Sequence, residues 1–312
     1  MDMSTGFIYD DIFLKHRPYG WHPERPERLV AIMKALEARP DLKEKLVFLN
    51  PERASIEDLK LIHTPGHIET VLKNGEGYLD PDTYISRDSP EAALYAVGAV
   101  KKAIEEVAKV TGGGRLKNAF CAVRPPGHHA TPERAMGFCL FNNVAIGARY
   151  AQKKGFKKVF IIDFDVHHGN GTQDAFYEDS TVFYFSTHQY PHYPGTGSER
   201  ERGSGEGLGF THNVPMRPGS GDREYMEVYG DILPGLIKDF SPDLILVSAG
   251  YDLMAEDPLS SIRISDEGIR FIIRSILGQG IPSIFCLEGG YDLTALSRAV
   301  VITIEELIKA GD

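Results

Sequence analysis

The stretch Val159-Phe160-Ile161-Ile162-Asp163-Phe164-Asp165-Val166-His167-His168-Gly169-Asn170-Gly171 decides the fold. Its leading apolar residues predict a buried strand over 158–162, and Gly-Asn-Gly predicts a turn after it. Side chains two positions apart share one face of a strand, so Asp163, Asp165 and His167 are expected to emerge together where the strand ends. Such a concentration of acids and imidazoles exceeds what a capped turn needs, and it indicates a metal site.

The composition is that of an ordinary globular protein and argues against several classes of partner. Of 312 residues, 42% are hydrophobic, and 34 basic against 44 acidic residues give a net charge of −10. Nucleic-acid affinity comes largely from basic residues on phosphates, so no nucleic-acid partner is expected. No apolar stretch approaches the ~20 residues that span a bilayer, so no membrane partner is expected either. The sequence leaves the oligomeric state open.

Cysteine usage and the first residues bear on localisation. The three cysteines, Cys121, Cys139 and Cys286, are scattered and form no disulfide framework. The opening residues lack the basic and apolar regions of a signal peptide. We therefore expect a cytoplasmic protein.

Short apolar runs alternate with amphipathic stretches along the whole chain. Helices are expected at 26–36, 55–62, 90–110, 142–153, 266–277 and 294–309, and strands at 7–9, 119–123, 158–162, 181–186, 244–248 and 283–287. This alternation predicts a single α/β domain over residues 1–312, with a mostly parallel central sheet and helices on both faces. Ser55 and Asp58 are expected to cap the second helix, and Gly112-Gly113-Gly114 to end the third. The Gly- and Pro-rich segment 188–218 is expected to be a long functional or mobile loop.

Each polar cluster of interest follows one of the predicted strands. His128 and His129 follow 119–123, Asp252 follows 244–248, and Tyr291 follows 283–287. The carboxyl ends of parallel strands meet at one edge of a sheet, where open α/β folds bind their ligands. We therefore expect these residues and the 163–167 cluster to form one active site.

The ligand set can be argued from its chemistry. Asp165, His167 and Asp252 offer two carboxylates and one imidazole, and three protein ligands with an open position are typical of catalytic zinc. Because thiolates are missing from the set, Fe(II), Co(II) or Mn(II) would also suit it. Such a metal lowers the pKa of its bound water and polarises a carbonyl.

Other groups at this edge can transfer protons or stabilise charge. His128 and His129 follow Pro125-Pro126-Gly127, a constrained loop that can direct both rings at one point. Asp163 and Asn170 are candidates to orient these imidazoles. Tyr291, next to two glycines, can donate a hydrogen bond to a developing oxyanion.

Six segments resemble the histone deacetylase family, including its bacterial acetoin-utilisation and acetylpolyamine amidohydrolase members. They are Arg124-Pro125-Pro126-Gly127-His128-His129, Gly137-Phe138-Cys139-Leu140-Phe141-Asn142-Asn143, Asp163-Phe164-Asp165-Val166-His167-His168-Gly169-Asn170-Gly171-Thr172, Tyr193-Pro194-Gly195-Thr196-Gly197, Ser248-Ala249-Gly250-Tyr251-Asp252 and Leu287-Glu288-Gly289-Gly290-Tyr291. They occur in the family's order, and His22-Pro23-Glu24-Arg25-Pro26-Glu27-Arg28-Leu29 extends the match toward the N-terminus.

The resemblance implies an arginase/deacetylase-type α/β fold and zinc-dependent hydrolysis of an N-acyl amide. Carried over by position, it makes Asp165, His167 and Asp252 the ligands of one catalytic Zn²⁺. It makes His129 the general base and then the acid. The remaining implied catalytic roles fall to His128 as the charged partner, Asp163 paired with His128, Asn170 paired with His129, and Tyr291 as the carbonyl-polarising donor.

The resemblance also implies where substrate and structural cations bind. The backbone carbonyl of Gly137 would accept the substrate N–H, and Phe138 and Tyr193 would form the aromatic walls of an acyl-lysine tunnel. A structural K⁺ is implied beside the zinc, through oxygens of Asp163, Asp165, His167, Ser186 and Thr187. A second cation near Phe176, Asp179 and Val182 is less strongly implied.

Two positions refine the assignment within the family. Asn170 and Leu287-Glu288-Gly289-Gly290 follow the class II pattern, and a neutral partner should leave His129 less basic than a carboxylate would. Tyr291 is Tyr rather than the His of weakly active class IIa enzymes. The expected partner is therefore an acetyl-lysine peptide or protein, or a small acyl-amine substrate.

Three alternatives remain at this stage. An acetylpolyamine amidohydrolase would carry an acidic gatekeeper at the rim, where this chain has Leu259. A binuclear manganese ureohydrolase would need further carboxylates at the positions of Gly169 and Gly250. A module that only reads acyl-lysine would not need Tyr291 and both histidines.

Overall fold

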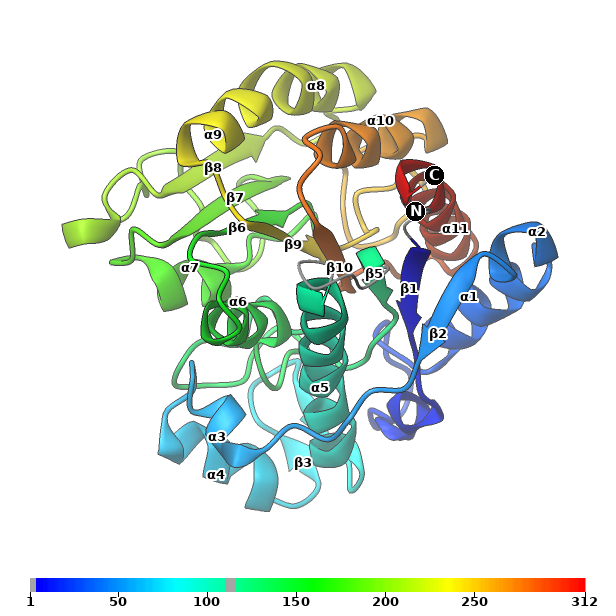
Figure 1. The fold of residues 1–312 in the computed structure, drawn as a ribbon. Coiled ribbons are helices and arrows are strands. Elements are labelled where there is room, and N and C mark those ends of the chain that lie inside the picture. Colours follow the sequence, from blue (N-terminus) through cyan, green and yellow to red (C-terminus); the bar gives the residue numbers. More distant parts are fainter. Residues whose placement is uncertain (1–3, 110–115, 312) are drawn as a thin grey trace.

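The computed structural model describes residues 4–109 and 116–311, and its centre is one eight-stranded sheet (Figure 1). The strand order is β2-β1-β5-β10-β9-β6-β7-β8, and every neighbouring pair runs parallel. The strands are β1 (Ser4–Ile8), β2 (Leu46–Leu49), β5 (Leu116–Cys121), β6 (Val159–Asp163), β7 (Val182–Gln189), β8 (Thr211–Met216), β9 (Leu244–Ala249) and β10 (Ser283–Leu287). A small antiparallel hairpin pairs β3 (Gly77–Tyr78) with β4 (Tyr84–Ile85).

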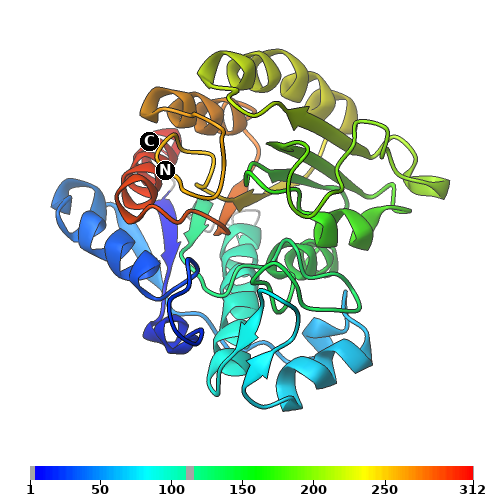
Figure 2. The same ribbon diagram turned by 180° about the vertical axis from the view of Figure 1, so that it is seen from behind.

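Helices cover both faces of this sheet, as Figures 1 and 2 show. On one face α5 (Ser89–Ala108) and α6 (Asn143–Lys153) pack on the central strands, and on the other α11 (Leu293–Gly311) packs on β1 and β5. Every residue of β6, β9 and β10 is buried, which explains why their sequences are apolar except for Asp163, Ser248 and Ser283. The remaining helices are α1 (Glu27–Glu37), α2 (Pro40–Lys43), α3 (Ile56–Leu59), α4 (Pro65–Lys73), α7 (Asn170–Phe176), α8 (Asp222–Glu227), α9 (Leu233–Phe240) and α10 (Asp266–Leu277).

The predicted fold class is confirmed: this is a single α/β domain with a parallel sheet between helices. The strand predictions at 158–162, 244–248 and 283–287 agree with β6, β9 and β10 to within one residue at each end. The predicted strand at 119–123 starts and ends too late, because β5 spans Leu116–Cys121. Val110 and Gly112-Gly113-Gly114, the predicted end of the 90–110 helix, lie outside the described residues.

Two local predictions were wrong in extent. The helix expected at 55–62 is only the single turn α3, although Ser55 and Asp58 do form a capping box at its start. The segment 188–218, expected to be a loop, contains strand β8, which pairs with β7 along Thr211–Met216. Pro215 obscured this strand in the sequence, but a proline is tolerated here because β8 is the edge of the sheet. Within the described ranges, no helix is both long and apolar enough to cross a membrane.

Two glycines within helices offer a matched test of how closely helix α5 packs against its neighbouring segment. Gly98 lies in α5, where an added Cβ would come 1.5 Å from the carbonyl oxygen of Glu52. Gly235 lies in α9 with nothing within 4 Å of such a Cβ. We expect Gly98→Ala to lower the free energy of unfolding by about 1–3 kcal/mol through overpacking. Gly235→Ala should raise it by up to about 1 kcal/mol because alanine is the better helix former. Thermal and denaturant unfolding of the two variants measure this, and a stabilised Gly98→Ala protein would contradict the packing.

Candidate active site

Three potential metal ligands converge where two neighbouring strands end. Asp165 and His167 follow β6, and Asp252 follows β9, which pairs with β6. One ligand atom from each lies within 4.8 Å of the others, and all three side chains are buried. His167 Nδ1 lies 3.1 Å from Asp165 Oδ1 and 3.0 Å from Asp252 Oδ2. Two carboxylate oxygens and one imidazole nitrogen thus face a common point.

The shape and charge of this point suit a divalent cation. A Cβ at Gly250 would lie 2.0 Å from Asp165 Oδ2, and one at Gly289 would lie 2.2 Å from Asp252 Oδ2, so glycine is required around the carboxylates. Burial disfavours charge on His167, yet Asp165 and Asp252 outweigh it and raise the pKa of this imidazole to about 10. The cluster therefore attracts positive charge, and its donor set fits a catalytic metal.

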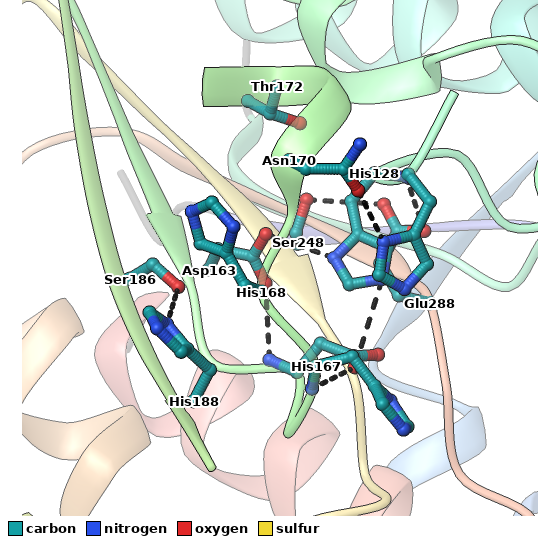
Figure 3. A network of polar contacts seen from close by, with 12 residues as sticks. His128, Asp163, His167, His168, Asn170, Thr172, Ser186, His188, Ser248 and Glu288 are labelled. Carbon is teal, nitrogen blue, oxygen red and sulfur yellow. Dashed lines mark hydrogen bonds and ion pairs between the residues drawn. The ribbon is translucent and has the colours of Figure 1, made fainter. Parts of the chain in front are cut away.

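The adjacent histidines lie beside this cluster and each binds a different partner; Figure 3 labels His128, Asp163 and Asn170. His128 and His129 follow β5, and their ring centroids are 4.0 Å apart. His128 Nδ1 lies 3.0 Å from Asp163 Oδ2, and His129 Nδ1 lies 2.9 Å from Asn170 Oδ1. Asn170 is positioned by its place in the first turn of α7. The structure therefore brings together the two pairs that the resemblance implies.

The surroundings of the two imidazoles shift their pKa values in opposite directions. Burial opposes a charge on His128, but Asp165 and Asp163 overcome it and raise the pKa of His128 to about 10. Burial lowers the pKa of His129 well below its ordinary value, and the charges of His128 and His167 lower it further. His128 is thus driven toward its cationic form and His129 toward its neutral form.

A narrow cavity of about 80 Å³ reaches this cluster. The residues expected to contact substrate all line it: Gly137, Phe138, Tyr193 and Leu259. The rest of the lining is the expected metal ligand His167, the expected catalytic residues His129 and Tyr291, and the carboxylic acid Asp82. Gly137 has φ +56°, and a Cβ there would lie 2.4 Å from the His129 ring. Phe138 also adopts a left-handed φ of 68°, which is unusual for an aromatic residue and is often found at functional sites.

The comparisons with known proteins agree with this geometry. Residues 22–307 match the model of the histone deacetylase domain. The chain belongs to the histone deacetylase family. A probable deacetylase of Archaeoglobus fulgidus is 39% identical over 93% of this chain and 82% of its own length. A probable deacetylase of Methanothermobacter thermautotrophicus is 43% identical over 89% and 83%, and histone deacetylase 10 (chloroplastic) of Oryza sativa is 40% identical over 92% and 70%.

A solved structure supports the same family at the level of the fold. The crystal structure of the HDA15 HD domain superposes with a TM-score of 0.94 at 36% identity, covering 99% of this chain and 90% of the other. Together with the relatives named deacetylases, this histone deacetylase fold indicates a hydrolase.

Three buried charged residues that support the site were not identified from the sequence. Glu288 accepts hydrogen bonds from the Gly127 N–H at 2.6 Å and the Ser248 hydroxyl at 3.1 Å (Figure 3), and burial raises its pKa to about 7. Arg28 donates to the carbonyl oxygens of Glu288 at 2.5 Å and Gly290 at 2.6 Å. Glu288 and Arg28 appear in the quoted motifs, which was the only signal for them.

The third residue, Asp257, clamps two loops of this deacetylase-family site. Its Oδ1 accepts the Leu259 N–H at 3.0 Å, and its Oδ2 accepts the N–H groups of Tyr291 at 2.6 Å and Asp292 at 3.2 Å. Asp257 therefore fixes the rim residue Leu259 relative to Tyr291. The flanking Glu256 and Pro258 gave no sign of this, because the donors are backbone groups and those of Tyr291 and Asp292 are distant in sequence.

This clamp can be tested with a matched pair of variants. In Asp257→Asn one oxygen becomes an NH₂ group, which cannot accept from Tyr291 and Asp292 while the remaining oxygen serves Leu259. We expect faster amide hydrogen exchange in both loops and a roughly tenfold lower kcat, because misplacement of a catalytic group is costly. Asp243→Asn is the control. Asp243 accepts hydrogen bonds from the N–H groups of Lys157 and Lys158 where strands β6 and β9 begin, at the opposite end of these strands from the site. Unchanged exchange at Tyr291 in Asp257→Asn would contradict the clamp.

Proposed function

We propose that this chain is a zinc-dependent deacetylase that hydrolyses the amide of N-acetyl-lysine or a related N-acyl amine. The observation that carries the proposal is that His129, His167 and Tyr291 line the same narrow cavity, which we interpret as the substrate tunnel. Asp165, His167 and Asp252 would hold the zinc. When bound, zinc supplies Lewis acidity, which polarises the amide carbonyl and acidifies water.

His129 has the geometry of the general base. Its Nδ1–H donates to Asn170 Oδ1, so Nε2 carries the free lone pair. Nε2 takes a proton from the attacking water and then returns it to the leaving amine, so that water and amide give acetate and a free amine. A neutral ring is needed at the start, and the low pKa of His129 supplies it.

His128 and Tyr291 stabilise the negative charge that develops on the carbonyl oxygen. His128 donates through Nδ1 to Asp163, remains cationic, and acts electrostatically. Burial and the charge of Asp252 raise the pKa of Tyr291 well above its ordinary value, so its hydroxyl stays protonated and can donate. The Tyr291 ring is held between Arg28, 5.0 Å from its centroid, and Phe138 at 5.9 Å.

The tunnel suits an unbranched aliphatic amine. Phe138 and Tyr193 would flank the methylene groups, and the Gly137 carbonyl would accept the amide N–H. Leu259 at the rim is apolar, which favours acyl-lysine over acetylpolyamines, the alternative substrate class. A ureohydrolase is disfavoured because a Cβ at Gly169 would lie 2.1 Å from Asp163 Oδ2, which leaves no space for a further carboxylate.

The structural potassium implied by the resemblance remains part of this proposal. Its ligands would be largely backbone oxygens, since the Ser186 hydroxyl is 2.8 Å from His188 Nδ1 and the Thr187 hydroxyl is 3.0 Å from the Tyr229 hydroxyl. At the second implied cation position, Asp179 is already paired with Arg149.

The decisive experiment combines metal analysis with a substrate panel and a tyrosine variant. We expect about one zinc per chain, loss of activity with a chelator, and preference for acetyl-lysine peptides over N-acetylputrescine. Tyr291→Phe should lower kcat by about 10²–10³, as removal of an oxyanion donor does. Tyr225→Phe is the control, because Tyr225 is buried and its hydroxyl has no hydrogen-bond partner among the described residues.

Each rival has a distinct signature in the same experiment. Two manganese ions per chain would indicate a ureohydrolase, and strong preference for N-acetylputrescine would indicate a polyamine enzyme. Full turnover by Tyr291→Phe would refute the assigned oxyanion donor, and binding without hydrolysis of any acyl amide would indicate a reader module.

The pH profile tests the pairing of His129 with Asn170. Asn170→Asp places a carboxylate on the imidazole, which favours the protonated ring and raises its pKa. Because the base form is required, we expect the acidic limb of kcat/KM to move to higher pH by about one unit or more. Asn74→Asp adds the same charge at an exposed helix end and should leave the profile in place. An unmoved or lowered limb in Asn170→Asp would contradict His129 as the base.

A further inference from the structure

Two of the most exposed large apolar side chains lie on one loop near the start of the chain. Trp21 is 78% exposed and Tyr19 is 76% exposed, and Trp21 is the only tryptophan in the sequence. Aromatic side chains are costly to leave in water, and when they gather at one place they mark a contact surface. Trp and Tyr are also the residues that most often dominate binding energy at interfaces.

The loop that carries Tyr19 and Trp21 meets the β3–β4 hairpin, which Figure 2 shows in cyan, through the Tyr19 ring. The Tyr19 ring is 6.4 Å from that of Tyr84, and Tyr84 is 5.1 Å from Tyr78, which is itself 56% exposed. We call Tyr19, Trp21, Tyr78 and Tyr84 the aromatic strip. It comes from two segments about sixty residues apart in sequence, so local sequence alone does not produce it.

The strip adjoins the mouth of the tunnel. His22, next to Trp21, packs its ring 4.7 Å from the tunnel-wall residue Phe138. The same imidazole lies 3.3 Å, through Nε2, from the carbonyl oxygen of Asp82, which lines the tunnel cavity two residues before Tyr84. The Phe138 N–H donates to the Thr83 hydroxyl at 3.0 Å. Both segments of the strip are therefore joined to the tunnel wall by residues adjacent in sequence.

We propose that the aromatic strip binds the polypeptide that flanks an acyl-lysine held in the tunnel. The inference rests on the proposed function: an acyl-lysine side chain that fills the narrow tunnel leaves its main chain at the mouth, where the strip begins. A small acyl-amine would leave the strip uncovered. The strip thus points to a peptide or protein substrate with an apolar or aromatic residue close to the modified lysine.

The negative charge at the tunnel mouth indicates which residues of the peptide would be favoured beside the acyl-lysine. Asp80 and Asp82 lie between the two tyrosines of the hairpin, and burial and the Asp80 carboxylate raise the pKa of Asp82 to about 6. This crowding of carboxylates favours a cationic residue near the acyl-lysine. Trp21 and His22 also line a second hollow of about 240 Å³ together with Arg17 and Arg25, so the carboxylates lie on the hairpin side of the strip and the arginines lie on the loop side.

Kinetics on matched substrates test the strip separately from the chemistry. The substrates are an N- and C-capped acetyl-lysine, a peptide with aromatic and lysine residues around acetyl-lysine, and the same peptide with glycines instead. For Trp21→Ala and Tyr19→Ala we expect kcat/KM on the aromatic peptide to fall about tenfold through KM. Turnover of capped acetyl-lysine should change less than about twofold. Leu208→Ala is the control, because Leu208 is 67% exposed on the loop before β8, away from the tunnel lining. Equal losses on both substrates, or none on the peptide, would overturn the proposal.

Fluorescence separates this inference from failure of the proposed function. Because Trp21 is the sole tryptophan, its emission reports directly on the strip. Titrating the catalytically impaired Tyr291→Phe protein with each peptide should shift the emission and give a tighter Kd for the aromatic peptide than for the glycine peptide. This result would support peptide binding by the aromatic strip even if no acyl amide were hydrolysed. Equal Kd values, an unchanged spectrum, or a dimer in sedimentation that Trp21→Ala dissociates would refute it, the last by showing a second copy as the occupant.

Discussion

The structure depends on two buried carboxylates, Asp165 and Asp252, that share a single imidazole. Burying like charges together is strongly unfavourable unless each is compensated. Here the Gly289 N–H donates to Asp165 at 2.8 Å and the Val166 N–H donates to Asp252 at 2.9 Å, while His167 lies between them. The proposed metal ion would balance the residual negative charge. The loops after β6, β9 and β10 converge at this point, and Gly250 and Gly289 leave room for the carboxylates.

The loop that carries Tyr291 is held by a second set of buried charges. Arg28 binds two of its carbonyl groups, and Asp257 binds two of its N–H groups, so the loop is fixed from both sides. Arg28 is in turn paired with Glu24 at 3.1 Å, and Glu24 with Arg124 at 2.7 Å. All three of these charged side chains are fully buried, which is tolerable because every one is paired. The N-terminal segment therefore contributes to the site although none of its charged residues reaches the tunnel.

Much of the architecture could be predicted from the sequence because β6, β9 and β10 are buried on both faces and are therefore largely apolar. The polar residues directly after these strands, such as Asp165 and Asp252, stand out against that background. Edge strands β2 and β8 were missed because they lack such a pattern; Val47 and Phe48 in β2 are 38% and 46% exposed, and β8 includes Pro215. Asp257 was missed for a different reason: its partners are backbone N–H groups, whose direction is set by tertiary structure and leaves no mark on residue identity.

The proposed catalytic residues and the proposed peptide-binding residues also differ in burial. The proposed proton transfer requires closely placed atoms, and His128, His129 and Asp163 are buried and have hydrogen-bonded partners. The aromatic strip has no such restraint, since Tyr19 and Trp21 lie on an exposed loop and a contact surface tolerates shifts that a catalytic group does not. If the strip binds peptide as proposed, substitutions at residues 19–21 and 78–84 would change the preferred peptide without disturbing the buried charges. Asp165 and Asp252 have no such freedom, because a change at either one removes one of the two carboxylate partners of His167.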